Sequence, residues 1–99
     1  FAMVELNNKW NYINENGKIL SDTWFDVIED FNNGYACVNL NNKYNFIKED
    51  GTYLSDVWFD DVYGFDDIYK FYDEFGIVKL NNDWYKLDKR GNIIFCCNK

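Results

Sequence analysis

The sequence predicts an all-β protein of tandem antiparallel hairpins, and internal repetition is the main observation behind that prediction. The stretch LNNKWNYI at residues 6–13 returns as LNNKYNFI at residues 40–47 and, in altered form, as LNNDWYKL at residues 80–87. Residues 2–31 and 36–65 align without a gap and are identical at 17 of 30 positions. Periods of this length are typical of arrays in which each copy buries its apolar surface against its neighbours.

Each copy begins with a predicted hairpin. Its first strand, at residues 2–6, 36–40 and 76–80, places a small residue, Val and Leu on one face by alternation, and we expect that face to be buried. The Asn-Asn pair that follows tolerates the positive φ angles of a two-residue primed turn. The second strands are predicted at residues 9–13, 43–47 and 83–87.

Two further strands are predicted after each hairpin. Four-residue turns ending in Gly17, Gly51 and Gly91 lead to short third strands at residues 18–20, 52–54 and 92–95. Residues 23–28 and 57–62 are predicted as fourth strands. The third copy stops before this point, so we expect a twisted open array or partial barrel whose open β edges allow a homodimer.

One segment interrupts the β pattern between the second and third copies. Ile68, Phe71, Tyr72 and Phe75 are spaced as one face of a helix, so residues 66–75 are predicted to form a short inserted helix that Gly76 ends with a left-handed residue. The predicted single domain, residues 1–99, then divides into repeat one (1–34), repeat two (35–74, with the insertion at 66–74) and a partial repeat three (75–99).

The composition narrows the classes of function. The net charge of −7 repels nucleic acid and anionic membranes, so we expect no direct nucleic-acid binding, and no apolar run is long enough to cross a bilayer. Aromatic residues make up 21% of the chain, and proline is absent. Cys37, Cys96 and Cys97 form no disulfide framework, and reduced thiols fit a cytoplasmic protein.

The residue types of this chain provide few groups for catalysis or metal binding. Histidine is absent, which removes the usual general base and the commonest metal ligand. The acidic cluster Asp60, Asp61, Asp66 and Asp67 lacks the ordered loop of a calcium site and is interpreted as a solvated face. We therefore expect no enzyme activity, no cofactor and no bound metal.

Together these features resemble the WG-repeat proteins of bacteria and their phages. The resemblance rests on the pattern small-x-Val-x-Leu-Asn-x-Lys-Trp-x-Tyr-Ile, followed by acidic residues, Gly and an aromatic-Asp stretch, and it covers the chain except for the insertion. The Gly of the Trp-Gly signature is replaced by Asn11, Asn45 and Tyr85. The resemblance implies an all-β repeat module that binds and has no catalytic residues to carry over.

Two functions from different classes follow. The first is a protein-binding module, in its sharper form a small acidic inhibitor of a nucleic-acid-handling protein such as a phage-defence system. The expected contact surface is the insertion and the acidic strand before it: Trp58, Asp60, Asp61, Asp66, Asp67, Tyr69, Phe71, Tyr72, Asp73 and Glu74. The alternative is a carbohydrate- or cell-surface-binding module that stacks sugar rings on an aromatic row formed by Trp10, Tyr44 and Trp84 or by Trp24 and Trp58. Rows of this kind are also typical of a core.

Overall fold

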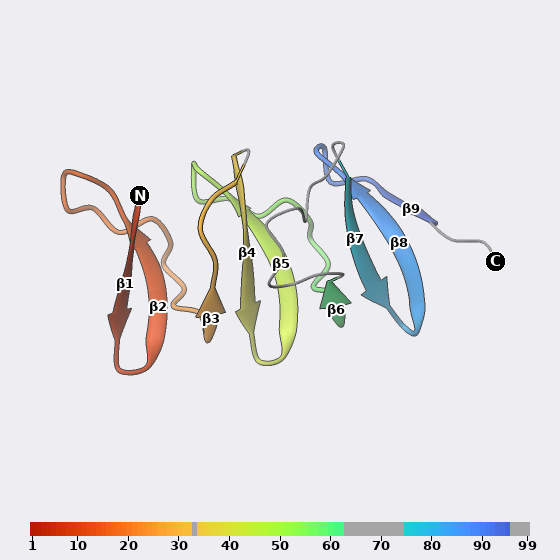
Figure 1. The fold of residues 1–99 in the computed structure, drawn as a ribbon, viewed down its shortest axis with the longest axis horizontal. Helices are drawn as coiled ribbons and strands as arrows, with labels where there is room; N and C mark the ends of the chain where they lie inside the picture. The colour runs from red at the N-terminus through yellow and green to blue at the C-terminus, as the bar shows by residue number, and fades with distance from the viewer. Residues whose placement is uncertain (33, 63–74, 96–99) are drawn as a thin grey trace.

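The computed structural model describes residues 1–32, 34–62 and 75–95, and it shows an open array of β-hairpins (Figure 1). A two-stranded, a three-stranded and a four-stranded antiparallel sheet follow one another along the chain. Their strands are β1 (Ala2–Leu6), β2 (Lys9–Ile13), β3 (Val27–Ile28), β4 (Tyr35–Leu40), β5 (Lys43–Lys48), β6 (Asp61–Val62), β7 (Phe75–Leu80), β8 (Asp83–Asp88) and β9 (Ile93–Phe95). The predicted all-β fold is confirmed, and the three sheets of the described residues do not close into a barrel.

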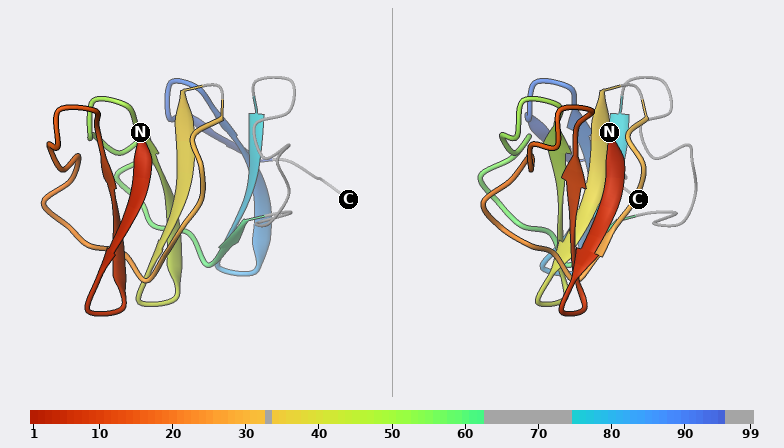
Figure 2. Two further views of the ribbon diagram at one scale, coloured as in Figure 1. Left: turned by 60° about the vertical axis from the view of Figure 1, so that its left-hand side comes forward. Right: turned by 90° about the vertical axis from the view of Figure 1, so that its left-hand side faces the viewer.

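The three hairpins are stacked side by side along the longest axis of the molecule. The extents are 46 × 25 × 22 Å, so the array is roughly twice as long as it is wide. The Asn-Asn turns of all three hairpins lie at one side of the array and the four-residue turns at the opposite side (Figures 1 and 2). This arrangement places equivalent residues of successive repeats in rows.

The Asn-Asn turns confirm the prediction made from residue type. All six central asparagines have positive φ angles, from 54° at Asn7 to 74° at Asn82. Direct pairing of Leu6 with Lys9, Leu40 with Lys43 and Leu80 with Asp83 leaves two residues in each turn. The backbone twist of such turns matches that of the flanking strands.

The predicted fourth strand is a crossover between hairpins rather than one continuous strand. Phe25 exchanges two backbone hydrogen bonds with Trp10 of its own hairpin, whereas Val27 and Ile28 pair with β4 of the next hairpin. Repeat two does the same, since Phe59 pairs with Tyr44 and β6 pairs with β7. The prediction was therefore wrong about continuity at residues 23–28 and 57–62, because the chain changes partner at the aspartate in the middle.

The third strands are also shorter than predicted in repeats one and two. Each is a single bridge, Ile13 with Ile19 and Ile47 with Tyr53. In repeat three the same position extends into a three-residue strand, β9, which pairs with β8.

The buried side chains form two clusters, and each lies between consecutive repeats. The first contains Tyr12 and Phe25 of repeat one with Ala36, Val38 and Ile47 of repeat two. The second joins repeats two and three and consists of Cys37, Phe46, Leu54, Phe59, Val62, Val78 and Leu87. Because strand side chains alternate, the central hairpin buries both faces, one against each neighbour. The core is therefore distributed over the repeat interfaces, as in solenoids.

In two repeats of three, the face predicted to be buried is buried at the small residue and at Val, whereas Leu40 and Leu80 are half-buried. Ala36 and Val38 are buried in repeat two, and Gly76 and Val78 in repeat three. In repeat one, by contrast, Ala2 and Leu6 are exposed and Val4 is half-buried. We call Ala2, Val4, Leu6 and Ile13 the leading face of repeat one, since the corresponding residues of the other repeats face the preceding repeat.

The end of the predicted helix is contradicted, and the rest of it lies outside the described residues. Phe75 begins strand β7, and Gly76 lies within that strand with no positive φ. Gly76 therefore cannot end a helix, and it is buried within β7. Residues 66–74 are not described, so the prediction of a helix there is untested.

Candidate partner-binding surface

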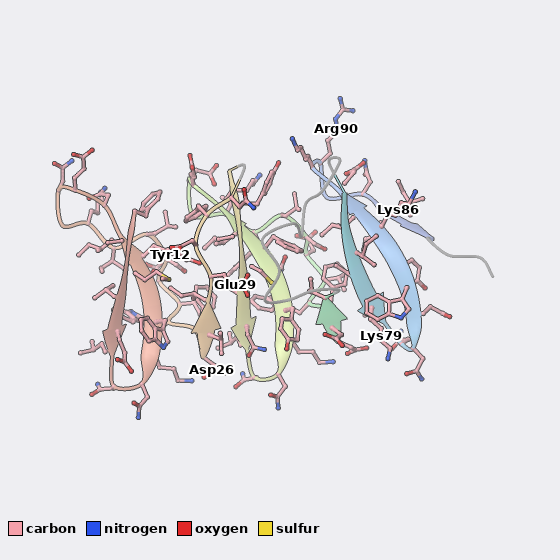
Figure 3. All side chains as sticks on the ribbon, in the orientation of Figure 1. Tyr12, Asp26, Glu29, Lys79, Lys86 and Arg90 are labelled. Carbon is pink, nitrogen blue, oxygen red and sulfur yellow. The ribbon has the colours of Figure 1, made fainter. Side chains whose placement is uncertain are left out.

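An aspartate in each crossover connects two neighbouring repeats. The Asp26 carboxylate forms an ion pair with Lys9 of its own hairpin and accepts a 2.8 Å hydrogen bond from the backbone N–H of Asn41 in the next hairpin. Asp60 repeats this arrangement with Lys43 and with the Asn81 N–H, at 2.9 Å. Figure 3 shows Asp26 beside the hairpin turns. We call these contacts the aspartate staples.

The staples favour the ionised carboxylates. The Lys9 ammonium, with help from the Asn41 N–H, lowers the pKa of Asp26, and Lys43 with the Asn81 N–H lowers the pKa of Asp60. Hydrogen bonds within turns lower the pKa of Asp50, through Thr52, and that of Asp88, mainly through the Asn92 N–H. Burial raises the pKa of Tyr12, whose hydroxyl donates to the Glu29 carbonyl oxygen.

Three of the predicted contact residues are described, and they differ in their surroundings. Trp58 is half-buried and packs edge-on against Tyr53, with ring centroids 5.2 Å apart, at the margin of the first cluster. Asp60 is engaged in a staple. Asp61 is exposed, and its carboxylate accepts a hydrogen bond from the Val62 N–H. The other predicted residues, Asp66, Asp67, Tyr69, Phe71, Tyr72, Asp73 and Glu74, lie outside the described residues.

Sequence reasoning assigned Asp60 to a partner surface and did not single out Asp26. The signal that could have revealed the staples is the recurrence of a Lys and an Asp 17 residues apart in both complete copies, Lys9 with Asp26 and Lys43 with Asp60. Recurrence at a fixed offset within a repeat indicates a structural contact as readily as a surface.

The asparagines that replace the signature glycine have a structural role. Asn45 has no exposed surface, and its side-chain amide donates to the Ser55 carbonyl oxygen at 2.9 Å while its Oδ1 accepts from the Phe46 N–H at 2.7 Å. Asn11 makes the equivalent bonds with Ser21 and Tyr12. Each asparagine thus fixes the loop ten residues further on. In repeat three the pair becomes Tyr85 and Phe95, which lie opposite one another in the β8–β9 ladder.

The aromatic rows are neither fully buried nor fully exposed. Trp10, Tyr44 and Trp84 are half-buried at corresponding positions of β2, β5 and β8, and Trp24 and Trp58 are half-buried as well. The Lys79 ammonium lies 5.8 Å from the centre of a Trp84 ring, within the range of a cation–π interaction. The residues of the first row are therefore partly accessible to solvent.

Charge is distributed unevenly along the array. Residues 1–62 contain eleven acidic and four basic side chains, whereas residues 75–99 contain two acidic and five basic ones. Figure 3 shows this polarity, with Asp26 and Glu29 in the first part of the array and Lys79, Lys86 and Arg90 in repeat three. The exposed carboxylates of the acidic part are Glu5, Glu15, Asp22, Asp30, Glu49, Asp50, Asp56 and Asp61.

The described residues offer few groups for other chemistry. They contain no cluster of three or more Cys, Asp or Glu side chains arranged to hold a metal ion. They also contain no helix with the length and apolarity needed to cross a membrane. Cys37 is buried in the second cluster, and Cys96 and Cys97 lie outside the described part of the chain.

Part of the chain matches a known family. A profile of the family described as WG containing repeat matches residues 12–44, which run from β2 through the crossover to the start of β5. No curated protein and no solved structure matches the chain. The matched segment spans the junction between two copies that are identical at 17 of 30 positions, and the third copy continues the same array. Residues 12–44 are thus similar to the WG containing repeat, over about a third of the chain.

Proposed function

We propose that this chain is a non-catalytic binding module that acts through protein–protein contacts, and that its partner is a nucleic-acid-handling protein with a basic groove. The observation that carries the proposal is the acidic part of the array, where eight carboxylates are exposed on two consecutive repeats. A surface of this charge attracts a basic groove and competes with the nucleic acid that the groove binds. A phage-defence protein is one target of this kind.

The structure changes which residues should be tested. Asp60 holds two repeats together, so replacing it would disturb the fold as well as the surface. Asp61 is exposed and remains a candidate, together with Asp66 and Asp67 of the insertion. A matched variant with the same number of charges removed elsewhere is Glu15→Gln, Asp22→Asn and Glu49→Gln, all at exposed positions.

The test is capture of a partner from host lysate at low salt and at about 0.5 M salt, where screening extends over only a few ångströms. The captured protein should bind nucleic acid, and the chain should displace that nucleic acid. Loss of capture in high salt and in the Asp61→Asn, Asp66→Asn, Asp67→Asn variant supports the proposed surface. Equal loss in the matched variant, whose residues also belong to the eight exposed carboxylates, would spread the contact over the whole acidic part of the array. If the amount of captured partner is the same at low and high salt, the proposal of an acidic inhibitor is contradicted.

The half-exposed aromatic row supports a second candidate, a module that binds carbohydrate or cell surfaces. Trp10, Tyr44 and Trp84 recur on adjacent hairpins, and partly exposed rings can stack on sugar rings. Titration with oligosaccharides should then change tryptophan fluorescence, and Trp10→Phe combined with Trp84→Phe should remove the change. No change with any glycan contradicts this candidate.

A further inference from the structure

The leading face of repeat one corresponds to surfaces that are covered in the other repeats. In repeat two, β3 pairs with the edge of β4, and Phe25, with no exposed surface, packs on Ala36, Val38 and Ile47. In repeat three, β6 pairs with β7, and Phe59 packs with Val78 and Leu87. Among the described residues β1 pairs with β2 alone, and no described strand lies along its other edge (Figure 1).

In both repeat interfaces, the crossover segment makes the same three contacts with the hairpin that follows it. The Asp26 N–H donates to the Asn39 carbonyl oxygen at 2.9 Å, and the Asp60 N–H donates to that of Lys79 at 2.8 Å. The carboxylate of each aspartate accepts a hydrogen bond from the N–H of the next Asn-Asn turn. The phenylalanine before each aspartate fills the apolar face. Repeat one offers the corresponding groups, namely the Glu5 carbonyl oxygen, the Asn7 N–H and the leading face.

The two ends of the array differ in the residues that they present. Repeat three carries Lys86 at the position of Tyr12 and Phe46, between Ile77 and Ile94 of the neighbouring strands, so one cation stands on its outward face where the other repeats have an aromatic ring. Polar substitution of this kind is how terminal repeats are capped. Repeat one keeps the apolar pattern of an internal repeat, and Leu6 is 58% exposed where Leu40 and Leu80 are half-buried. The two ends therefore differ by a charged side chain, and only the leading face of repeat one keeps the full apolar pattern of an interface.

We propose that the leading face of repeat one docks, by strand addition to β1, a Phe-Asp-x-Val or Phe-Asp-x-Ile segment from a WG repeat outside this chain. The two such segments of this chain already pair with β4 and β7, so a second copy could supply one only by opening its own array. The occupant is thus a crossover segment of another repeat. This docking uses the backbone edge of β1 and apolar side chains, whereas the acidic surface acts through carboxylates, so either proposal can fail without the other.

The first test is an NMR titration of the full chain with a peptide of residues 23–31. Binding should shift the amide signals of Met3, Glu5 and above all Asn7, which gains a carboxylate acceptor. The Phe25→Ala peptide should not bind, and the Asp26→Ala peptide should bind about tenfold more weakly, because a hydrogen bond to a charged group is lost. If only the amide signals of β4 shift, the peptide has replaced β3 of the chain, and the proposal is overturned.

Variants of the chain test whether the peptide binds at the leading face. Leu6→Asp should abolish peptide binding, whereas Ile94→Asp, at a comparably exposed residue of β9, should leave it unchanged. If Leu6→Asp and Ile94→Asp weaken peptide binding equally, the proposal is overturned. It is also overturned if the amide signals of β1 shift with protein concentration in the absence of peptide, because that would indicate a homodimer.

A chain extended at its N-terminus by a second copy of residues 1–34 removes the dependence on peptide affinity. The crossover of the added copy should slow hydrogen exchange at the amide of the original Asn7. It should also raise the midpoint temperature of thermal unfolding. If the Asn7 amide exchanges as fast as in the original chain, the leading face does not dock such a segment.

Discussion

The buried asparagine of each complete repeat is a residue whose loss would leave backbone groups without partners. In Asn45→Ala the Ser55 carbonyl oxygen and the Phe46 N–H lose the hydrogen bonds that Asn45 makes. An unsatisfied buried group costs about 1–3 kcal/mol, so we expect the free energy of unfolding in urea to fall by about 2 kcal/mol or more. Asn16→Ala, at an exposed turn residue, is the control and should change it by less than about 0.5 kcal/mol. Equal effects would contradict the assigned role.

The aspartate staples predict how stability responds to acid. Because the pKa of Asp26 and that of Asp60 are lower in the folded chain than in the unfolded chain, the staples stabilise the fold above about pH 4, the ordinary aspartate value. That stabilisation is lost as the pH falls through the lowered values. We therefore expect a smaller drop in urea midpoint between pH 6 and pH 3 for Asp26→Asn combined with Asp60→Asn than for the original chain.

The control for the staples is the pair Asp22→Asn and Asp56→Asn, which removes two exposed carboxylates at corresponding positions of the same repeats. Its pH dependence should follow that of the original chain. If both double variants flatten the pH dependence equally, net charge and not the staples causes the acid response.

At the scale of elements, the four-residue turns test how closely successive repeats are stacked. Gly17, Gly51 and Gly91 all have φ between 81° and 89°, so alanine at each position meets the same backbone strain of about 1–2 kcal/mol. A Cβ on Gly17 would meet nothing within 4 Å, one on Gly51 would lie 3.0 Å from the Leu20 carbonyl oxygen, and one on Gly91 would overlap that of Leu54. The three substitutions therefore separate backbone strain from stacking.

We expect the loss of stability on substitution by alanine to increase in the order Gly17, Gly51, Gly91. Overpacking typically adds about 1–3 kcal/mol, so Gly91→Ala should exceed Gly17→Ala by about that amount. Urea unfolding of the three variants measures the order. Equal losses would mean that the turns do not pack on the preceding repeat.

The hairpins could be predicted from sequence because their signals are local. The Asn-Asn turns fix the register, and the alternation of Ala36, Val38 and Leu40 identifies one of the two faces that β4 buries. The crossover could not be predicted in this way. Residues 23–28 read as one strand, but the partner changes at Asp26, and this change depends on where the next hairpin lies. The alternation of apolar and polar residues is also the same in β1 and β4. It therefore does not reveal that, within the described part of the chain, β4 is covered by a preceding crossover and β1 is not.

The candidate surface was less accessible to sequence reasoning. An acidic pattern does not distinguish Asp61, which is exposed, from Asp60, which joins two repeats. That distinction requires the geometry of the next Asn-Asn turn, 21 residues away. Similarly, equivalence of Trp10, Tyr44 and Trp84 predicted a row, but not that each ring would be half-buried.

At the scale of the whole molecule, the array has a direction. Its core is divided between two repeat interfaces, and its ends differ because Lys86 stands in repeat three where Tyr12 and Phe46 stand in the repeats before it. The leading face of repeat one, by contrast, retains the apolar residues of an internal interface. A cation on one end opposes the stacking of that end against the apolar end of another copy, because taking a charged ammonium out of water is costly.

Replacing this cation should therefore change the state of assembly. In Lys86→Phe the outward face of repeat three resembles that of repeat two, which packs on a leading face in the same chain. Contact between this end of one copy and the leading face of another is heterologous and does not close, so it should produce a series of oligomers that lengthen with concentration. Sedimentation velocity measures this series. Lys89→Phe removes the same charge in an exposed turn and should not associate in this way. If Lys86→Phe does not associate, or if Leu6→Asp fails to reverse its association, the leading face is not the surface that joins the copies.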